Sequence, residues 1–195
     1  MKNSMALFFV CLLFAGCKTW DISKMNVKNE PLSPRLLTLE KKIEDIQNVA
    51  FVANEDRMRI FTKEVEENLT DPFGEKYGYL IMKQNIIKLS RGPFWTCPNA
   101  WTVCIAMLFG CPIAHYKHVI DVEFRIMDSK NRLVGKYSAI GRGSGIAAMY
   151  YGYTVGKAMR KSYIDALNNA FDQMRPQIQK DASAINEKLN LSGKL

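Results

Sequence analysis

Apolar and polar residues alternate most clearly over residues 116–127. An alternation with a period of two predicts a β-strand with one buried face and one exposed face. The residues expected to point towards the core are Tyr116, His118, Ile120, Val122, Phe124 and Ile126. A turn at residues 128–131 and a returning strand over 133–140 complete a predicted hairpin. Two more strands are predicted, one over 79–89 and a short edge strand over 36–39.

A different period, of three to four residues, follows Asn54, which is a good N-cap residue. This spacing predicts an amphipathic helix that ends before Pro72. Its apolar positions are Met58, Phe61, Val65 and Leu69.

A second, longer helix is predicted to start between Gly145 and Gly156 and to run to about Arg175. Its expected inner stripe consists of Val155, Met159, Ser162, Ala166, Ala170, Phe171 and Met174. Pro176 predicts a break or a kink, because proline cannot donate to the carbonyl one turn earlier. Residues 181–191 are then expected to form a further short helix.

This order of elements predicts an α+β fold, because one sheet with helices on one face satisfies every apolar stripe. We expect a two-layer sandwich with an antiparallel or mixed sheet of about four to five strands and two main helices. A single domain spans residues 35–180, and residues 181–195 form a C-terminal helix or tail.

The N-terminus has a different character. One positive charge, on Lys2, precedes an apolar run over residues 5–14, which is too short to span a bilayer. The run ends in Leu13-Phe14-Ala15-Gly16-Cys17. This segment resembles the signal peptide and lipobox of bacterial lipoproteins, although Phe14 stands where that family more often has leucine.

The resemblance implies a signal peptide over residues 1–16, cleavage between Gly16 and Cys17, and a covalent lipid on Cys17. Residues 17–34 are then the lipidated cysteine and a polar tether. Because Lys18 is not aspartate, the resemblance also favours the outer membrane, on its periplasmic face. The rest of the chain resembles small envelope-assembly lipoproteins only in the order of its predicted elements.

The formal net charge of +8 becomes about +7 once Lys2 is removed, which suits anionic partners such as lipid headgroups. Export makes nucleic acid an unsuitable partner. A basic patch of Lys157, Arg160 and Lys161 has helical spacing and is a candidate contact for anionic lipid. The alternative is an ordinary solvated helix face.

Two stretches lack Asp, Glu, Lys and Arg, one between Arg91 and Lys117 and the other between Gly143 and Gly156. The first stretch leads into the start of the predicted hairpin, and the second follows its end. Because the two strands are antiparallel, both points lie at the end of the sheet opposite the turn. The candidate docking surface there consists of Trp95, Trp101, Leu108, Phe109, Tyr150 and Tyr151. In the alternative, both stretches fold over the sheet and complete its core.

Three cysteines remain after Cys11 leaves with the signal peptide and Cys17 takes the lipid. Cys97 and Cys111 could form a disulfide, or these two and Cys104 could be buried thiols, and spacing does not decide between them.

The chain offers little catalytic chemistry. Cys111, His115 and His118 have a spacing that invites a zinc site, but no fourth ligand is near and we expect no metal. His118 is instead expected to be a core histidine with a satisfied partner. Asp121 and Glu123 share a strand face without a cleft around them, so they do not make an acid–base site. The glycine run at residues 141–145 is expected to be flexible or closely packed backbone between strand and helix.

Three functions follow, in order of preference. The first is a non-enzymatic, lipid-anchored envelope protein that acts as an assembly, docking or interaction module, with an envelope protein as partner and no cofactor. The second is a carrier of lipid or another apolar ligand, with a cavity lined by Phe124, Ile126 and Phe171. The third is a tethered envelope hydrolase that uses His115 or His118 beside a carboxylate.

Overall fold

The computed structural model describes residues 27–44, 54–92, 112, 114–148 and 153–195. Its strands are β1 (Glu40–Ile43), β2 (Gly78–Gly92), β3 (Ala114–Asp128) and β4 (Leu133–Ala147), and its helices are α2 (Asn54–Glu64) and α4 (Val155–Ser192). A π-helical turn, Val65–Leu69, extends α2. These elements form the predicted α+β fold, with one mixed sheet and two helices.

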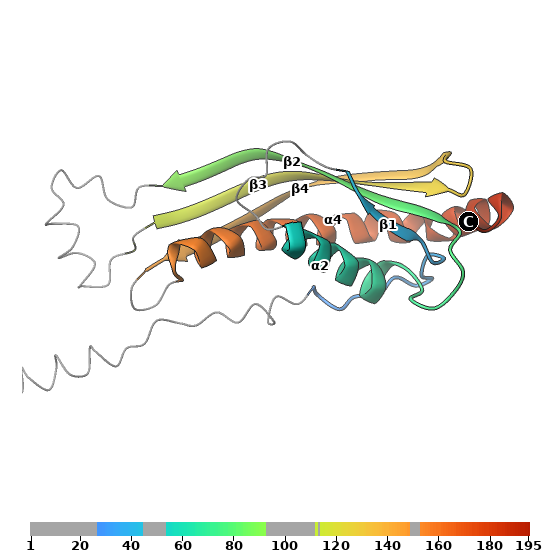
Figure 1. Ribbon diagram of the computed structural model, residues 1–195, viewed down its shortest axis with the longest axis horizontal. Coiled ribbons are helices and arrows are strands. Elements are labelled where there is room, and N and C mark those ends of the chain that lie inside the picture. The colour runs from blue at the N-terminus through green and yellow to red at the C-terminus, as the bar shows by residue number, and fades with distance from the viewer. Residues whose placement is uncertain (1–26, 45–53, 93–111, 113, 149–152) are drawn as a thin grey trace, which may run out of the picture.

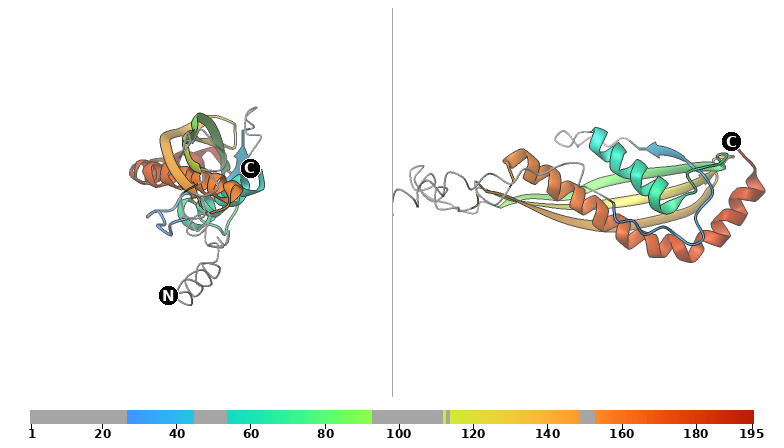
Figure 2. Two further views of the ribbon diagram at one scale, coloured as in Figure 1. Left: turned by 90° about the vertical axis from the view of Figure 1, so that its left-hand side faces the viewer. Right: turned by 90° about the horizontal axis from the view of Figure 1, so that it is seen from below.

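The sheet has the order β1-β2-β3-β4, in which β1 runs parallel to β2 and the other neighbours are antiparallel. Figure 1 shows that the three long strands lie beside α4 along the length of the molecule. Both helices lie on the same face of the sheet, and no element of the described ranges covers the opposite face, which we call the open face (Figure 2). The predicted two-layer arrangement is therefore confirmed.

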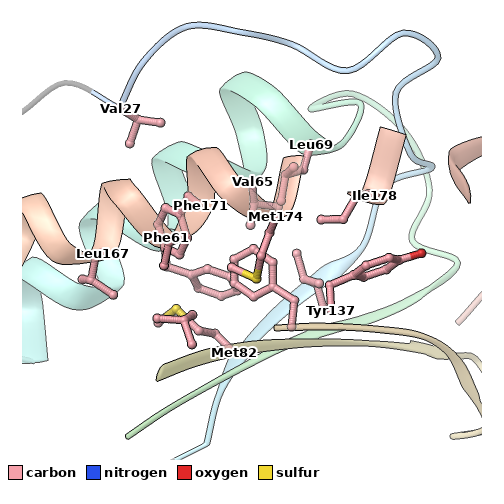
Figure 3. Packing of buried hydrophobic residues seen from close by; sticks show 14 of the residues in the cluster. Val27, Phe61, Val65, Leu69, Met82, Tyr137, Leu167, Phe171, Met174 and Ile178 are labelled. Atoms are coloured by element: carbon pink, nitrogen blue, oxygen red, sulfur yellow. The ribbon is translucent and has the colours of Figure 1, made fainter. Parts of the chain in front are cut away.

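The alternation along β3 sets which face is covered. All six residues predicted to face the core are buried, and the residues between them point to the open face. Aromatic rings join the layers: the ring centroid of Phe124 lies 5.3 Å from that of Phe171 and 5.6 Å from that of Phe61 (Figure 3). Burial of such apolar area on both sides supplies most of the stabilisation of a two-layer fold.

Helix α4 corrects the predicted break at Pro176. One helix of 38 residues continues through this proline to Ser192, so the separate helix predicted over residues 181–191 is the last part of α4. Pro176 is exposed, while Met174 and Ile178 beside it are fully buried. Packing of this inner stripe outweighs the loss of one hydrogen bond, and the helix curves along the sheet (Figure 2, right).

The short edge strand also differs from its prediction, since it lies at Glu40–Ile43 and not at residues 36–39. Leu36 instead pairs with Thr70 through an isolated bridge, and its amide donates to the carbonyl of Leu69. Residues 36–39 are therefore the buried approach to the strand.

The glycine run of residues 141–145 is part of strand β4, so the expectation of a flexible connector was wrong and the expectation of close packing is confirmed. A Cβ atom on Gly141 would lie 1.9 Å from the carbonyl oxygen of Ala166. On Gly143 it would lie 2.1 Å from the carbonyl oxygen of Ser162, and on Gly145 it would lie 2.1 Å from that of Ala158. Strand and helix therefore meet backbone to backbone.

This approach also brings helix side chains to the free edge of β4. Asn169 Oδ1 accepts a hydrogen bond from the amide of Arg142 at 3.0 Å, and Gln173 Nε2 donates to the carbonyl of Ile140 at 3.1 Å. Unpaired backbone amides and carbonyls on an edge strand can pair with a strand of another chain. The side chains of Asn169 and Gln173 bind two of these backbone groups on β4.

Replacing Gly143 by alanine should lower the free energy of unfolding by at least about 2 kcal/mol, because the new methyl group meets fixed backbone. Gly156→Ala in the first turn of α4 is the matched control, since nothing lies within 4 Å of a Cβ there. That change should raise stability by up to about 1 kcal/mol through helix propensity. Denaturant unfolding of both variants measures the difference, and equal effects would contradict the backbone contact.

Candidate functional site

One end of the sheet gathers the starting points of both uncharged stretches. Gly92 at the end of β2 pairs with His115 near the start of β3, and His115 pairs with Ile146 near the end of β4. Helix α4 also begins at this end (Figure 1). The predicted common origin of the two stretches is confirmed, and we call this the segment end of the sheet.

The residues proposed for docking lie outside the described part of the chain, as do Gly16, Cys17 and the remaining cysteines. The docking surface, the lipidation site and the Cys97–Cys111 disulfide stay predictions.

A small second core closes the segment end. It consists of Ala114, Tyr116, Ala147 and Ala158, with Tyr153 and Met159 packed against it. The guanidinium of Arg91 lies 5.8 Å from the centre of the Tyr116 ring, on the helix side of the sheet. This end of the described fold is thus finished by packed side chains.

The open face of the sheet has two halves of different electrostatic character. In the half nearer the β3–β4 turn, cations and carboxylates of neighbouring strands pair with one another. Lys83 Nζ lies 3.0 Å from Glu44 Oε1, Arg125 Nη1 lies 3.4 Å from Glu44 Oε2, and Lys136 Nζ lies 2.9 Å from Glu123 Oε2. Such cross-strand pairs neutralise this half and support the register.

Glu123 belongs to this paired half. Burial alone would raise the pKa of its carboxyl, but hydrogen bonds from Lys136 and Arg125 hold the pKa below its ordinary value. A carboxylate held ionised by two cations has no proton to donate, which agrees with the expectation that Asp121 and Glu123 are not an acid–base pair.

The half nearer the segment end carries cations without partners. Lys88 on β2 and Arg142 on β4 both pair in register with Val119 of β3, and Lys117 lies one outward-facing position further along β3. Lys117 is flanked in register by Ser90 and Ser144. We call these two rows, Lys88–Val119–Arg142 and Ser90–Lys117–Ser144, the basic rows.

All three cations of the basic rows are exposed, and none forms an ion pair with a residue that the structure describes. The next carboxylate on this face is that of Asp121, which lies one row away between Asn85 and Ile140. The described structure shows no ion pair between Asp121 and the three cations. The basic rows therefore concentrate positive charge on this face of the sheet.

A β-bulge in β2 hides the basic rows from the alternation of polar and apolar residues in the sequence. The register of β2 shifts between Ile86 and Lys88, so Lys88 points to the open face although its even-numbered neighbours up to Ile86 point to the core. Arg142 was also placed beyond the end of its strand. Only Lys117 stood on the polar face that alternation predicts.

Two of the three cations in the helix patch of Lys157, Arg160 and Lys161 form ion pairs with carboxylates of the same chain. Arg160 forms a two-pronged ion pair with the buried carboxylate of Asp56, and Lys161 pairs with Asp165 one turn later. Lys157 is the one member of this patch for which the described structure shows no ion pair. The solvated-face alternative accounts for most of the patch, and lipid contact there stays a prediction.

His118 is a buried core histidine with a partner, as predicted. Its Nδ1 lies 2.7 Å from Ser162 Oγ, and that hydroxyl donates to the carbonyl of Met159 at 2.7 Å. Nδ1 therefore carries the proton and donates to the serine, which is the wrong direction for activating a nucleophile. Burial lowers the pKa of His118, which favours the neutral ring.

His115 points to the opposite, open face of the sheet. No group of three His, Cys, Asp or Glu in the described ranges could hold a metal ion.

The residues proposed to line a ligand cavity fill the core. Phe124, Ile126 and Phe171 are at most 1% exposed, and the two rings stack on each other. The space between sheet and helices at this place is occupied by side chains, which does not support the carrier.

A groove of about 500 Å³ lies beside β1, between residues 38–41 and 65–76. Its cations are paired, Lys41 with Glu66 and Lys76 with Glu40, and its hydroxyls donate to backbone carbonyls. The groove offers no activated nucleophile, so it does not support the hydrolase.

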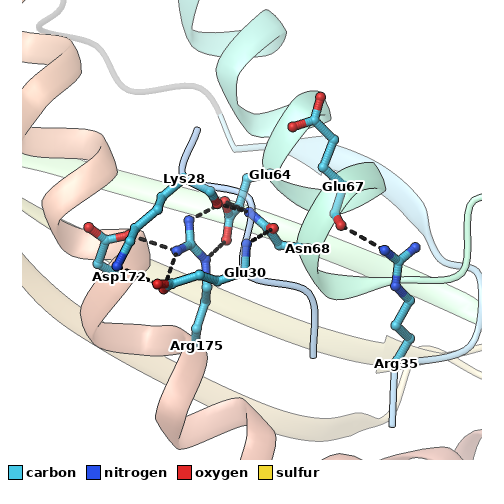
Figure 4. Close-up of polar contacts among 8 residues, drawn as sticks. All are labelled: Lys28, Glu30, Arg35, Glu64, Glu67, Asn68, Asp172 and Arg175. Atoms are coloured by element: carbon cyan, nitrogen blue, oxygen red, sulfur yellow. Dashed lines mark hydrogen bonds and ion pairs between the residues drawn. The ribbon is translucent and has the colours of Figure 1, made fainter. Parts of the chain in front are cut away.

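A buried ion pair that sequence analysis did not find joins the helices to the N-terminal segment (Figure 4). Arg175 donates from Nε and Nη2 to the two carboxylate oxygens of Glu64, at 2.6 and 2.7 Å, and both residues are nearly inaccessible. Asn68 donates to Glu64 at 2.7 Å and accepts from the amide of Glu30 at 2.8 Å. Residues 27–34, assigned to the tether, are thereby fixed to the helices.

No protein-family model matches the sequence, and no curated protein matches it significantly. Solved structures that match the chain include a candidate neuraminyllactose-binding hemagglutinin homolog from Helicobacter pylori, at 10% identity and a TM-score of 0.38 over 89% of this chain and 96% of that one. A candidate lipoprotein from Caulobacter crescentus has 15% identity and a TM-score of 0.27 over 59% of this chain and 68% of that one. A minor lipoprotein from Acinetobacter baumannii has 11% identity and a TM-score of 0.29 over 76% and 93%.

Similarities this weak carry no argument about function.

Within the described ranges, no helix is both long and apolar enough to cross a bilayer.

The buried ion pair gives a stability prediction. Glu64→Gln removes the buried carboxylate that pairs with Nε and Nη2 of Arg175 and leaves only the half-exposed carboxylates of Asp172 and Glu30 at Nη1, so the free energy of unfolding should fall by about 3 kcal/mol. The control is Glu66→Gln, two residues after Glu64, which removes the exposed partner of Lys41. This change should lower the free energy of unfolding by less than about 1 kcal/mol. Similar losses in denaturant unfolding of the two variants would contradict the clamp.

His118 gives a pH prediction. As the pH falls towards the ordinary histidine pKa of 6.5, the unfolded chain binds a proton more readily than the folded protein, because burial lowers the pKa of His118 in the fold. The free energy of unfolding should therefore fall as the pH is lowered from about 7.5 through about 6.5, with this residue contributing up to about 1.4 kcal/mol per pH unit.

The two histidines of the chain provide the comparison. His118→Gln should flatten this part of the stability curve, whereas His115→Gln on the open face should retain it. A curve that His118→Gln leaves unchanged would show that burial of His118 does not set the pH dependence.

Proposed function

We propose that this chain is a non-enzymatic, lipid-anchored protein of the bacterial envelope that serves as a docking or assembly module. The observation that carries the proposal is the signal-peptide and lipobox pattern ending at Cys17. Two or more acyl chains on this cysteine would anchor the protein stably, since each buried methylene contributes about 0.8 kcal/mol.

The fold supports a short attachment. Val27 is buried against the core, and the amide of Leu32 donates to the carbonyl of Asn68 at 2.8 Å. Free tether is thus limited to the residues before Val27, ten positions after Cys17, which can reach at most about 35 Å. Such a tether keeps the domain close to its membrane, which we propose is the outer membrane at its periplasmic face.

The absence of prepared chemistry in the described residues favours docking over catalysis. His118 is a hydrogen-bond donor within the core, and the residues proposed to line a cavity are packed. The segment end of the sheet is the proposed contact for an envelope protein, because both uncharged stretches start there. The carrier and the hydrolase remain second and third, with no observation of the fold in their favour.

Changing Cys17 to serine tests the anchor. Since serine offers no thiol for lipid attachment, the variant should leave the membrane fraction or remain unprocessed, and its mass should lack the acyl chains. Cys11→Ser is the matched control, because it alters a cysteine of the predicted signal peptide and should leave mass and fractionation of the mature protein unchanged. A Cys17→Ser protein with normal mass and membrane association would refute the proposal.

A further inference from the structure

We propose that the basic rows, Lys88–Val119–Arg142 and Ser90–Lys117–Ser144, dock on a membrane surface rich in anionic phospholipid. This inference rests on the proposed envelope location, and it assigns a contact to residues other than the helix patch. The occupant follows from the charge, the shape and the apolar border of this surface.

Charge is the first argument. Lys88, Lys117 and Arg142 come from three neighbouring strands and have no ionic partner among the described residues, while the other half of the same face is neutralised by cross-strand pairs. Exposed cations near an anionic leaflet each contribute about 1 kcal/mol of attraction. The two serine hydroxyls beside Lys117 can hydrogen-bond phosphate oxygens.

Shape is the second argument. The three cations project from the same face of three neighbouring strands, so together they can contact more than one headgroup. Cα positions in neighbouring strands are about 5 Å apart and alternate residues along a strand about 7 Å apart. The cations therefore cover an area larger than a single phosphate, which suits a lipid surface.

Isolated apolar side chains border the basic rows. Ile146 and Ile140 on β4 are 40% and 48% exposed and lie one row to either side, and Ile87 at the bulge is 54% exposed. Cations with interspersed large apolar residues are typical of surfaces that rest at the headgroup boundary.

The attachment point allows this contact. The described chain starts at Val27, which lies on the side of the helices away from the sheet (Figure 3). The open face therefore points away from that entry point, towards an apposed membrane. The ten residues back to Cys17 are also long enough, at about 35 Å, to let the domain turn on its own bilayer.

The test uses the processed, lipidated protein anchored in neutral phosphatidylcholine vesicles, so that its own bilayer offers no anionic surface. Acceptor vesicles contain equal parts of phosphatidylcholine and phosphatidylglycerol, and clustering is followed by energy transfer between lipid dyes. We expect clustering with these acceptors and none with pure phosphatidylcholine acceptors. Raising salt from about 0.1 to about 1 M should abolish it, because the Debye length falls from about 10 to about 3 Å.

Two triple variants locate the contact. Lys88→Gln/Lys117→Gln/Arg142→Gln should weaken clustering roughly a hundredfold, given about fivefold for each cation. The control Lys130→Gln/Lys180→Gln/Lys188→Gln removes the same charge from exposed residues of the β3–β4 turn and of α4, none of which is ion-paired in the described structure. The control should cluster as the unmodified protein does, and denaturant unfolding should show both variants folded.

Three outcomes would overturn the inference: equal clustering with neutral acceptors, equal loss in both triple variants, or release by inorganic phosphate well beyond that caused by chloride of equal ionic strength. The last would indicate a small-anion site. These results are separate from the anchor itself, because the mass of the purified protein and its retention in donor vesicles report lipidation directly.

Discussion

The backbone contact between helix α4 and strand β4 determines how the rest of the fold is arranged. Three alternate residues of β4, Gly141, Gly143 and Gly145, have no side chain where the helix passes. The helix therefore lies on β4 itself, covers one face of the sheet and reaches the free edge with Asn169 and Gln173. No described element covers the opposite face, and Lys88, Lys117 and Arg142 on it form no ion pair with the described residues.

The clamp around Arg175 has a different role, because it joins parts of the chain that are far apart in sequence. It ties α4 to Glu64 at the end of α2, and through Asn68 to the backbone of Lys28 and Glu30 (Figure 4). A buried pair of this kind adds little net stability but fixes one arrangement, since every alternative leaves a buried charge unpaired. A pull on the N-terminal segment would thus be passed to both helices.

Local patterns predicted much of this fold. The alternation in β3 identified its buried face residue by residue, and the cap at Asn54 located the start of α2, because both signals act within a few positions. Pro176 misled because propensity is weaker than the packing of Met174 and Ile178 on either side. The glycine run misled because glycine in a strand and glycine in a loop look alike until the helix that packs on it is known.

The candidate site depended on register, which local patterns do not contain. A bulge of one residue after Ile86 turned Lys88 outward, and the extension of β4 by seven residues added Arg142 to the same row. The buried pair was equally hidden, since Glu64 and Arg175 lie 111 positions apart and each resembles an exposed helix residue in sequence.

The uneven charge of the open face is the strongest sign that this surface has a role beyond solubility. A sheet face that only needs to be soluble can intersperse both signs, as the half around Glu44 and Glu123 does. In the basic rows, Lys117 is instead the diagonal neighbour of both Lys88 and Arg142, and Asp121, their diagonal neighbour on the other side, offsets the repulsion among the three cations only in part. One added carboxylate in either row would relieve that repulsion. An arrangement that works against the stability of the sheet is explained if an anionic surface outside the protein supplies the missing charge.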